Sequence, residues 1–206
     1  MKNFRDLVGQ ARTLATEYTS ARTAAERPDP DLNPEADARR RSEQVGKVRE
    51  QFGARFDALL ATARAERDTI AAAARKARPS LDGDDAAALV RTEQAWSHNV
   101  RPLLEKGRTV AEALEGQGAD EALGAERFGS SWLAQHATEG TPASHAREVS
   151  SAVAGALAAL APSPGAAEAI LAGDAVDRDL SALEQVVGHA REGRALEAAM
   201  AARYTD

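Results

Sequence analysis

A heptad register in the first 115 residues is the feature that most constrains the fold of this chain. Between residues 4 and 25, apolar or small side chains recur at alternating spacings of three and four: Phe4, Leu7, Ala11, Leu14, Tyr18, Ala21 and Ala25. A period of 3.5 residues keeps one narrow stripe of a helix facing a partner helix, and a β-strand cannot use it. The pattern therefore predicts long helices packed side by side.

Breaks at proline divide this register into three predicted helices. The first covers residues 3–26, and a second helix, of about 44 residues, ends before Pro79. After a turn at residues 80–84, a third helix carries the register to Leu114, with a kink near Asn99 because Pro102 lacks an N–H group. Three consecutive helices with heptad seams most simply form an antiparallel bundle.

The apolar seam of the second helix contains the first candidates for an interface. The residues expected to hold the hairpin and any oligomer together are Phe52, Phe56, Leu59 and Ile70. Because the second helix is much longer than the first, we expect one end of it to protrude or to be covered by other chains. Gly46 and Gly53 lie one heptad apart beside the seam, so we expect a close helix–helix approach there.

The segment Gly116-Gln117-Gly118 predicts a boundary between a long-helix bundle, 1–117, and a compact helical subdomain, 118–206. Shorter helices are expected in the second part, at about 120–137, 142–160, 164–171 and 176–203. The pairs Asn33-Pro34, Thr141-Pro142 and Ser163-Pro164 are typical of a helix cap followed by a first-turn proline. Trp96 and Trp132 fall on predicted core faces, although exposed tryptophans would anchor a partner.

Motifs for common enzyme chemistry are not found in this sequence. The chain has no cysteine, no glycine-rich phosphate loop and no G-x-S-x-G elbow. Three histidines precede a glutamate by three residues, a spacing that places both side chains on one helix face: His136 and Glu139, His145 and Glu148, His189 and Glu192. We interpret these as surface pairs rather than metal ligands. We therefore expect no catalytic residue, no metal, no cofactor and no enzymatic activity.

The distribution of charge separates the two parts of the chain. Residues 1–80 carry 16 basic and 12 acidic side chains, whereas residues 81–206 carry 10 basic and 20 acidic ones. This asymmetry suggests docking surfaces of opposite sign, although drift in surface composition would produce it too. The run Arg39–Arg41 is interleaved with acids and lacks nearby aromatics, which favours a solvated helix face over nucleic-acid binding.

Membrane association is not expected. The most apolar window, Ala152–Ala161, is about half as long as a membrane span needs. Charged residues interrupt the N-terminal segment, so it does not read as a secretory signal. We expect a cytoplasmic protein, or one carried inside an assembly made in the cytoplasm.

In general style the chain resembles the small helical virion and assembly proteins of tailed phages that infect high-GC bacteria. The resemblance is carried by the Ala-, Arg- and Glu-rich composition, the absence of cysteine and the long hairpin from Phe4 through Ala77. It covers the first half of the chain better than the second and assigns no functional residue. Such proteins decorate capsids, scaffold their assembly or join head to tail. Scaffolds of this group often have long disordered stretches, whereas this chain has only the short break at 27–33, a departure that favours a folded, retained component.

The sequence thus predicts an all-α protein with an N-terminal antiparallel three-helix bundle, coiled-coil-like seams and a C-terminal helical subdomain. The function we expect is a non-enzymatic structural or assembly role, in which the chain binds other copies and a larger surface such as a capsid. The alternative is a cytoplasmic helical adaptor or regulator that binds a basic protein through its acidic C-terminal part.

Overall fold

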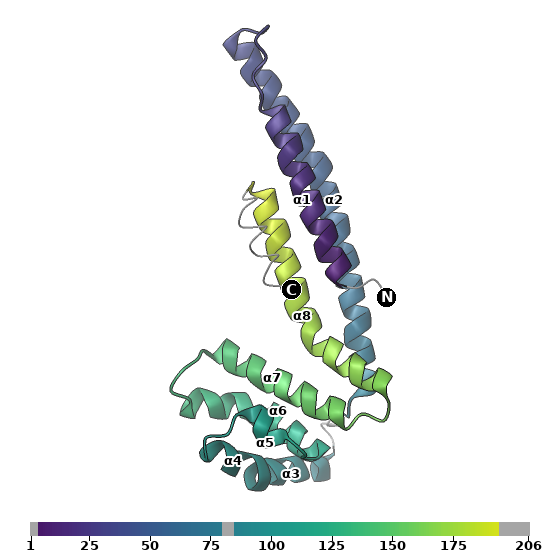
Figure 1. Ribbon diagram of the computed structural model, residues 1–206, viewed down its shortest axis with the longest axis vertical. Helices are drawn as coiled ribbons and strands as arrows, with labels where there is room; N and C mark the ends of the chain where they lie inside the picture. The colour runs from purple at the N-terminus through teal and green to yellow at the C-terminus, as the bar shows by residue number, and fades with distance from the viewer. Residues whose placement is uncertain (1–3, 80–84, 194–206) are drawn as a thin grey trace. The chain divides into compact units, whose positions relative to one another are not determined.

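The computed structural model describes residues 4–79 and 85–193, and every regular element within these ranges is helical (Figure 1). The elements are α1 (Phe4–Ala25), α2 (Pro34–Ala77), α3 (Ala86–Ala95), the π-helix η1 (Trp96–Val100), α4 (Arg101–Glu105), α5 (Val110–Leu114), α6 (Ala119–His136), α7 (Pro142–Ala159) and α8 (Pro164–Arg191). The all-helical expectation is confirmed for these residues. The turn expected at 80–84 and the expected end of the last helix at 203 lie outside the described residues.

The chain forms two compact units that differ from the division expected from the sequence. One unit combines Met1–Thr69 with Val176–Asp206, and the other is Ile70–Ala175. The expected boundary at residues 117–118 falls inside the second unit, in the turn between α5 and α6. Helices α2 and α8 each contribute residues to both units, so a division at one point in the sequence does not describe the fold.

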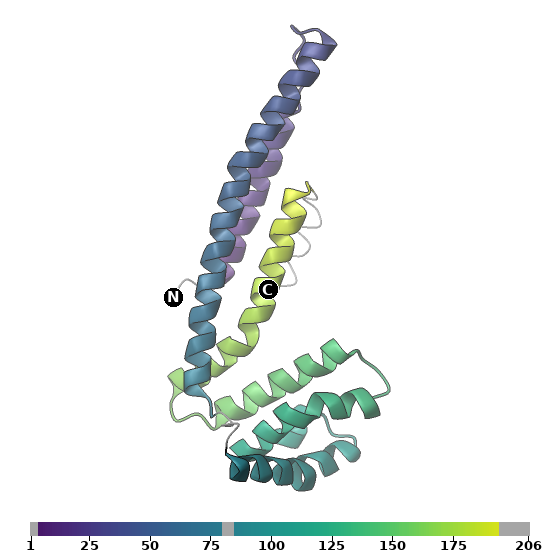
Figure 2. The same ribbon diagram turned by 180° about the vertical axis from the view of Figure 1, so that it is seen from behind.

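In the first unit, α1 and α2 form an antiparallel hairpin (Figures 1 and 2). The ring of Tyr18 on α1 lies 5.5 Å from the ring of Phe52 and 6.1 Å from that of Phe56, measured between centroids. Val8 and Ala15 are buried as well as the heptad positions of α1, except Ala21, which is only partly buried. The buried stripe of α1 is therefore wider than the a and d positions of a two-helix coiled coil.

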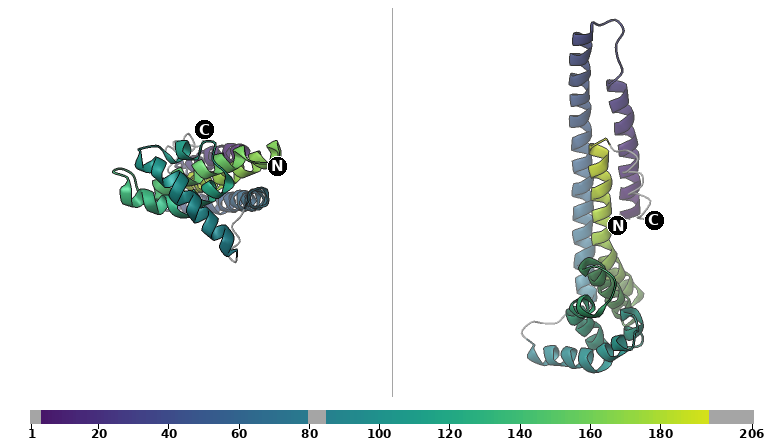
Figure 3. Two further views of the ribbon diagram at one scale, coloured as in Figure 1. Left: turned by 90° about the horizontal axis from the view of Figure 1, so that it is seen from below. Right: turned by 90° about the vertical axis from the view of Figure 1, so that its left-hand side faces the viewer.

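The second half of α8 packs along α2 and covers one side of the hairpin (Figure 3, right). Three ion pairs join the two helices: Arg64 with Glu184 at 2.7 Å, Arg67 with Asp177 at 2.7 Å, and Arg191 with Asp57 at 2.6 Å. Exposed pairs of this kind contribute about 0.2–1 kcal/mol each, so buried apolar contacts provide most of the stability. Here α8, and not the segment after residue 85, is the third helix against the hairpin.

The glycines of the long helices do not have the role expected for Gly46 and Gly53. A Cβ atom added at either position would meet nothing within 4 Å, so no close helix approach occurs there. Gly173 has that role instead, because a Cβ atom added there would collide with Ala74 of α2. The sequence predicts a break between residues 171 and 176, but α8 is continuous there. Gly173 has no side chain, and this lets α8 approach α2 closely.

The second unit is built around α6 and α7, which pack against each other and against the short helices that precede them (Figure 2). Its core consists of buried side chains from η1 through α8: Trp96, Val100, Leu104, Val110, Ala113, Leu114, Ala122, Ala125, Leu133, Val149, Val153, Ala154, Leu157 and Ile170. Most of these are small or branched aliphatic residues, so the packing depends on many modest contacts.

The expected third helix of the bundle is split before Pro102. The N–H of Arg101 donates to the carbonyl of Trp96, which makes one π-helical turn between α3 and α4. A proline ring clashes with the carbonyl four residues earlier, and the wider turn accommodates it. The interruption expected near Asn99 is confirmed, and residues 86–114 belong to the second unit rather than to the hairpin.

Three helix starts follow the capping pattern expected from the sequence. The Asn33 side chain accepts a hydrogen bond from the Ala36 N–H at 2.9 Å. Thr141 and Ser163 accept equivalent bonds from residues three positions further on, both at 3.2 Å. A side-chain cap satisfies an N–H group that has no partner within the helix, so these starts are determined locally.

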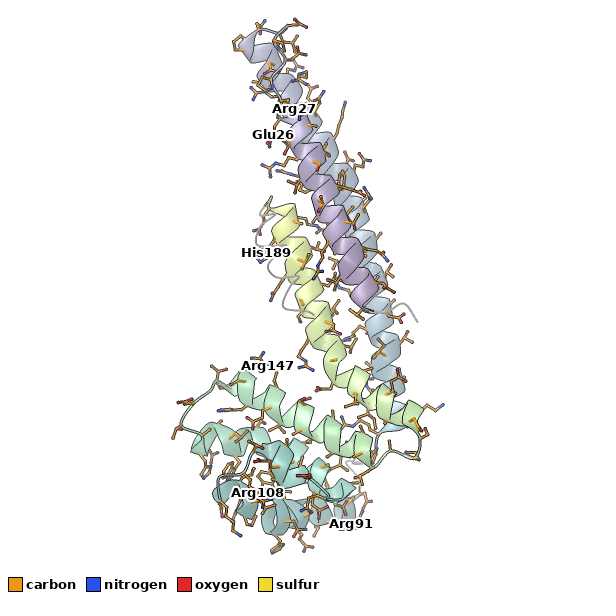
Figure 4. The ribbon with its side chains drawn as sticks, viewed as in Figure 1. Glu26, Arg27, Arg91, Arg108, Arg147 and His189 are labelled. Atoms are coloured by element: carbon orange, nitrogen blue, oxygen red, sulfur yellow. The ribbon has the colours of Figure 1, made fainter. Side chains whose placement is uncertain are left out.

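The loop between α1 and α2 is held by the carboxylate of Asp37, near the end of the hairpin where Figure 4 labels Glu26 and Arg27. Asp37 accepts hydrogen bonds from the Asp29 N–H at 3.1 Å and from the Arg40 guanidinium at 2.8 Å, and it pairs with Arg41 at 2.9 Å. The hydrogen bond from Arg40 is the main reason that the pKa of Asp37 lies below its ordinary value.

We predict that this carboxylate makes the stability of the hairpin depend on pH. A lowered folded-state pKa stabilises the fold above the pKa of the unfolded chain, and this contribution is lost as the pH falls through the folded value. The stability difference between wild type and Asp37→Asn should therefore be present at pH 7 and shrink below about pH 4. Urea unfolding over this pH range measures it, with Asp31→Asn in the same loop as the control. A difference that stays constant with pH would contradict the prediction.

Candidate interaction surfaces

The four seam candidates of α2 are buried within the chain. The exposed fractions are 6% for Phe52, 1% for Phe56, 8% for Leu59 and 8% for Ile70. The first three belong to the hairpin unit, whereas Ile70 is the first residue of the second unit. These side chains are placed to stabilise the fold of one chain and offer little apolar area to a partner.

The two tryptophans lie in different environments. Trp96 is buried in the core of the second unit, with its ring centroid 6.2 Å from that of Phe128. Trp132 packs against the same core but is partly exposed, and its ring stacks on His136 with centroids 4.4 Å apart. Trp96 therefore serves packing, and only Trp132 presents an aromatic surface to solvent.

The histidine–glutamate pairs do not converge. His145 is buried rather than exposed as expected, and its Nε2 lies 3.0 Å from the backbone carbonyl oxygen of Glu139. Because α6 ends at His136, Glu139 does not share its helix face. Within residues 4–79 and 85–193, no three acidic or histidine side chains gather as a set of metal ligands.

The basic run of α2 pairs with acids, as its interleaved sequence suggested. Arg39 pairs with Glu43 at 3.2 Å, and Arg40 and Arg41 both pair with Asp37. Each pair joins residues three or four positions apart on one helix face. Much of the positive charge at this end of the hairpin is thus compensated within α2.

An open, mainly apolar surface lies in the second unit, between α5 and α7, and we call it the α5–α7 groove. Its floor consists of small side chains and one leucine: Ala111, Leu114, Ala152, Gly155, Ala156 and Ala159. Leu160, the residue that follows α7, closes one end and is 49% exposed. Gln117 and Ser151 add polar groups to the lining.

The groove has an acidic rim formed by Glu112, Glu115 and Glu148. Glu112 forms a capping box with Thr109, accepting the Thr109 N–H at 2.8 Å, and this hydrogen bond is the main reason that the pKa of Glu112 is lowered. Glu115 and Glu148 are exposed and form no ion pair with another described residue. Glu115 and Glu148 are therefore placed where a cationic side chain of a partner could reach them.

Our interpretation of the sequence missed this groove, although α7 carries a signal for it. The core-facing stripe of α7, which contains Val149 and Val153, forms an apolar repeat in the sequence. A second stripe of Ala152, Gly155 and Ala159 has the same alternation of three and four, but its residues are too small to mark a buried face. A small-residue stripe beside a core stripe indicates a place where another helix can approach closely.

Comparisons with known proteins find no match to this chain among protein-family models, curated proteins or solved structures. Across the described ranges, none of the helices combines the length and the apolar character that crossing a bilayer requires.

Proposed function

We propose that this chain is a non-enzymatic structural or assembly protein that binds other copies of itself and a larger protein surface, as a virion component. The observation that supports this proposal is the α5–α7 groove, an apolar surface with a half-exposed leucine at its end. Exposed apolar patches rimmed by polar residues are typical of protein-binding surfaces.

The hairpin supports the same proposal through its length. Helix α2 has 44 residues, which corresponds to about 66 Å of continuous helix. We propose that α1 and α2 act as a rod-like hairpin, held together by a seam with Phe52 and Phe56 at its centre. A rod of this kind suits a component that spans positions in a larger assembly.

A second candidate function is a helical adaptor that binds a basic protein. The acidic rim of the groove favours it, because Glu112, Glu115 and Glu148 all belong to the acidic part of the chain. Exposed charge pairs weaken as salt increases, so a heterocomplex that dissociates with rising ionic strength would support the adaptor over the virion component.

Density-gradient fractionation of lysate from the native source separates the two candidates. We expect the chain, located by mass spectrometry, to sediment in constant stoichiometry with a megadalton particle. Fractions at the top of the gradient that contain the chain only as a small soluble species would contradict the virion assignment and favour the adaptor.

A further inference from the structure

We propose that the α5–α7 groove binds one amphipathic helix of a partner protein, with the helix's small and leucine side chains on the groove floor and its lysine or arginine side chains over the acidic rim. This inference rests on the proposed function, because it describes what the partner presents to the surface that supports that function.

The shape of the groove fits a helix. Its long wall runs on α7 from Glu148 to Leu160, a distance of about 18 Å at the helical rise, which matches roughly 12 residues of bound helix. Gly155 on the floor has open space above it, since an added Cβ atom would meet nothing within 4 Å. Small floor residues let helix axes approach closely, and neither α5 nor α7 offers the unpaired backbone groups that an added strand needs.

The apolar character of the floor determines which face of the partner lies inward. The alanines of α7 would cover apolar side chains of the partner, and Leu160 would pack against the end of its apolar stripe. This is the recognition mode in which an amphipathic helix places its apolar positions in a groove between helices. A helix with only polar side chains would lose its hydration on the apolar floor without gaining hydrogen bonds in exchange.

The negative charge of the rim determines which side chains flank the apolar stripe of the partner helix. Glu112, Glu115 and Glu148 line the groove, and Arg108 lies near Glu112. Glu115 and Glu148 pair with no described cation. Complementary charge at the edge of an interface speeds association and selects against partners of the wrong sign.

A synthetic helical peptide of about 14 residues, with a leucine and alanine stripe and lysine flanks, tests the shape of the site. Its binding to the full chain is measured by fluorescence anisotropy of a dye on the peptide. Gly155→Leu places a large side chain in the groove, at a position where an added Cβ atom meets nothing within 4 Å, and should weaken binding at least about tenfold. Gly46→Leu is the matched control, because Gly46 is an exposed helical glycine with equally open surroundings and should leave binding unchanged.

Glu112→Gln, Glu115→Gln and Glu148→Gln, combined in one variant, test the charge of the rim. Glutamine retains the capping box at residue 112, so α5 should persist. We expect at least about tenfold weaker binding at low salt and a flatter dependence on ionic strength. A twin peptide with glutamate in place of lysine should bind the wild-type chain at least about tenfold more weakly.

Three results would overturn the inference. The first is binding of the lysine peptide that Gly155→Leu leaves unchanged, and the second is equal affinity for the lysine and glutamate peptides. The third is self-association of the chain that Gly155→Leu abolishes, because the groove would then hold a second copy. Sedimentation with a particle judges the proposed function independently, so either proposal can fail while the other stands.

Discussion

Phe56→Asp is expected to destabilise the hairpin unit by at least about 5 kcal/mol, which is comparable to the whole stability of a typical domain. Phe56 is 1% exposed and its ring lies edge-on to that of Tyr18. The substitution removes this packing and places a carboxylate where water cannot reach it. Arg191 lies 5.7 Å from the ring centroid but already binds Asp57, so the new carboxylate would compete for it.

Urea unfolding followed by circular dichroism measures this effect. Phe56→Leu is the matched control and should cost about 1–2 kcal/mol, because it keeps an apolar, though smaller, side chain at the buried position. A Phe56→Asp variant that remained folded, with unchanged oligomeric mass and unchanged partner binding, would show that the seam of α2 does not hold the hairpin.

Gly124→Ala is expected to destabilise the second unit by about 2–3 kcal/mol, although alanine is the better helix former. A Cβ atom at this position of α6 would lie 2.5 Å from the carbonyl oxygen of Thr92 and 3.0 Å from the Cβ of Trp96. The backbone of α3 is one of the groups in contact, so a change of side-chain rotamer cannot relieve the collision. Helices α3 and α6 would have to separate.

A glycine-to-alanine substitution in open surroundings should change the stability in the opposite direction. Gly46→Ala is expected to stabilise the chain by about 0.5–1 kcal/mol, because the added methyl group meets nothing and reduces the conformational freedom of the unfolded chain. Thermal and urea unfolding of both variants measure the contrast. Equal effects of the two substitutions would show that α3 and α6 do not approach each other as closely as the structure indicates.

The groove illustrates a kind of site that sequence patterns do not reveal. Its rim combines Glu112 of α5 and the following Glu115 with Glu148 from α7, and these glutamates resemble the many other surface acids of the chain. Only the packing of α5 on α7 places them around one apolar floor. Conversely, the paired spacing of His145 and Glu148 suggested a surface pair, but burial places His145 against the α6–α7 loop instead.

Local signals in the sequence were sufficient for the helices themselves. The 3.5-residue period located α1 and α2, the Asn33, Thr141 and Ser163 caps marked helix starts, and Pro102 marked the interruption before α4. Each of these signals acts between residues a few positions apart, so the residues involved are neighbours in the sequence as well as in space.

By itself, the sequence determined that the chain is helical and where most of its helices begin. The tertiary structure alone decided that α8 continues through Gly173 and returns to the hairpin, which divides the chain into units that are not continuous in sequence. The contacts responsible, such as Arg64 with Glu184 and Arg67 with Asp177, join residues 120 and 110 positions apart. Any arginine can pair with any acid, so the ion pairs do not by themselves determine where α8 packs. That position depends on which apolar faces pack best.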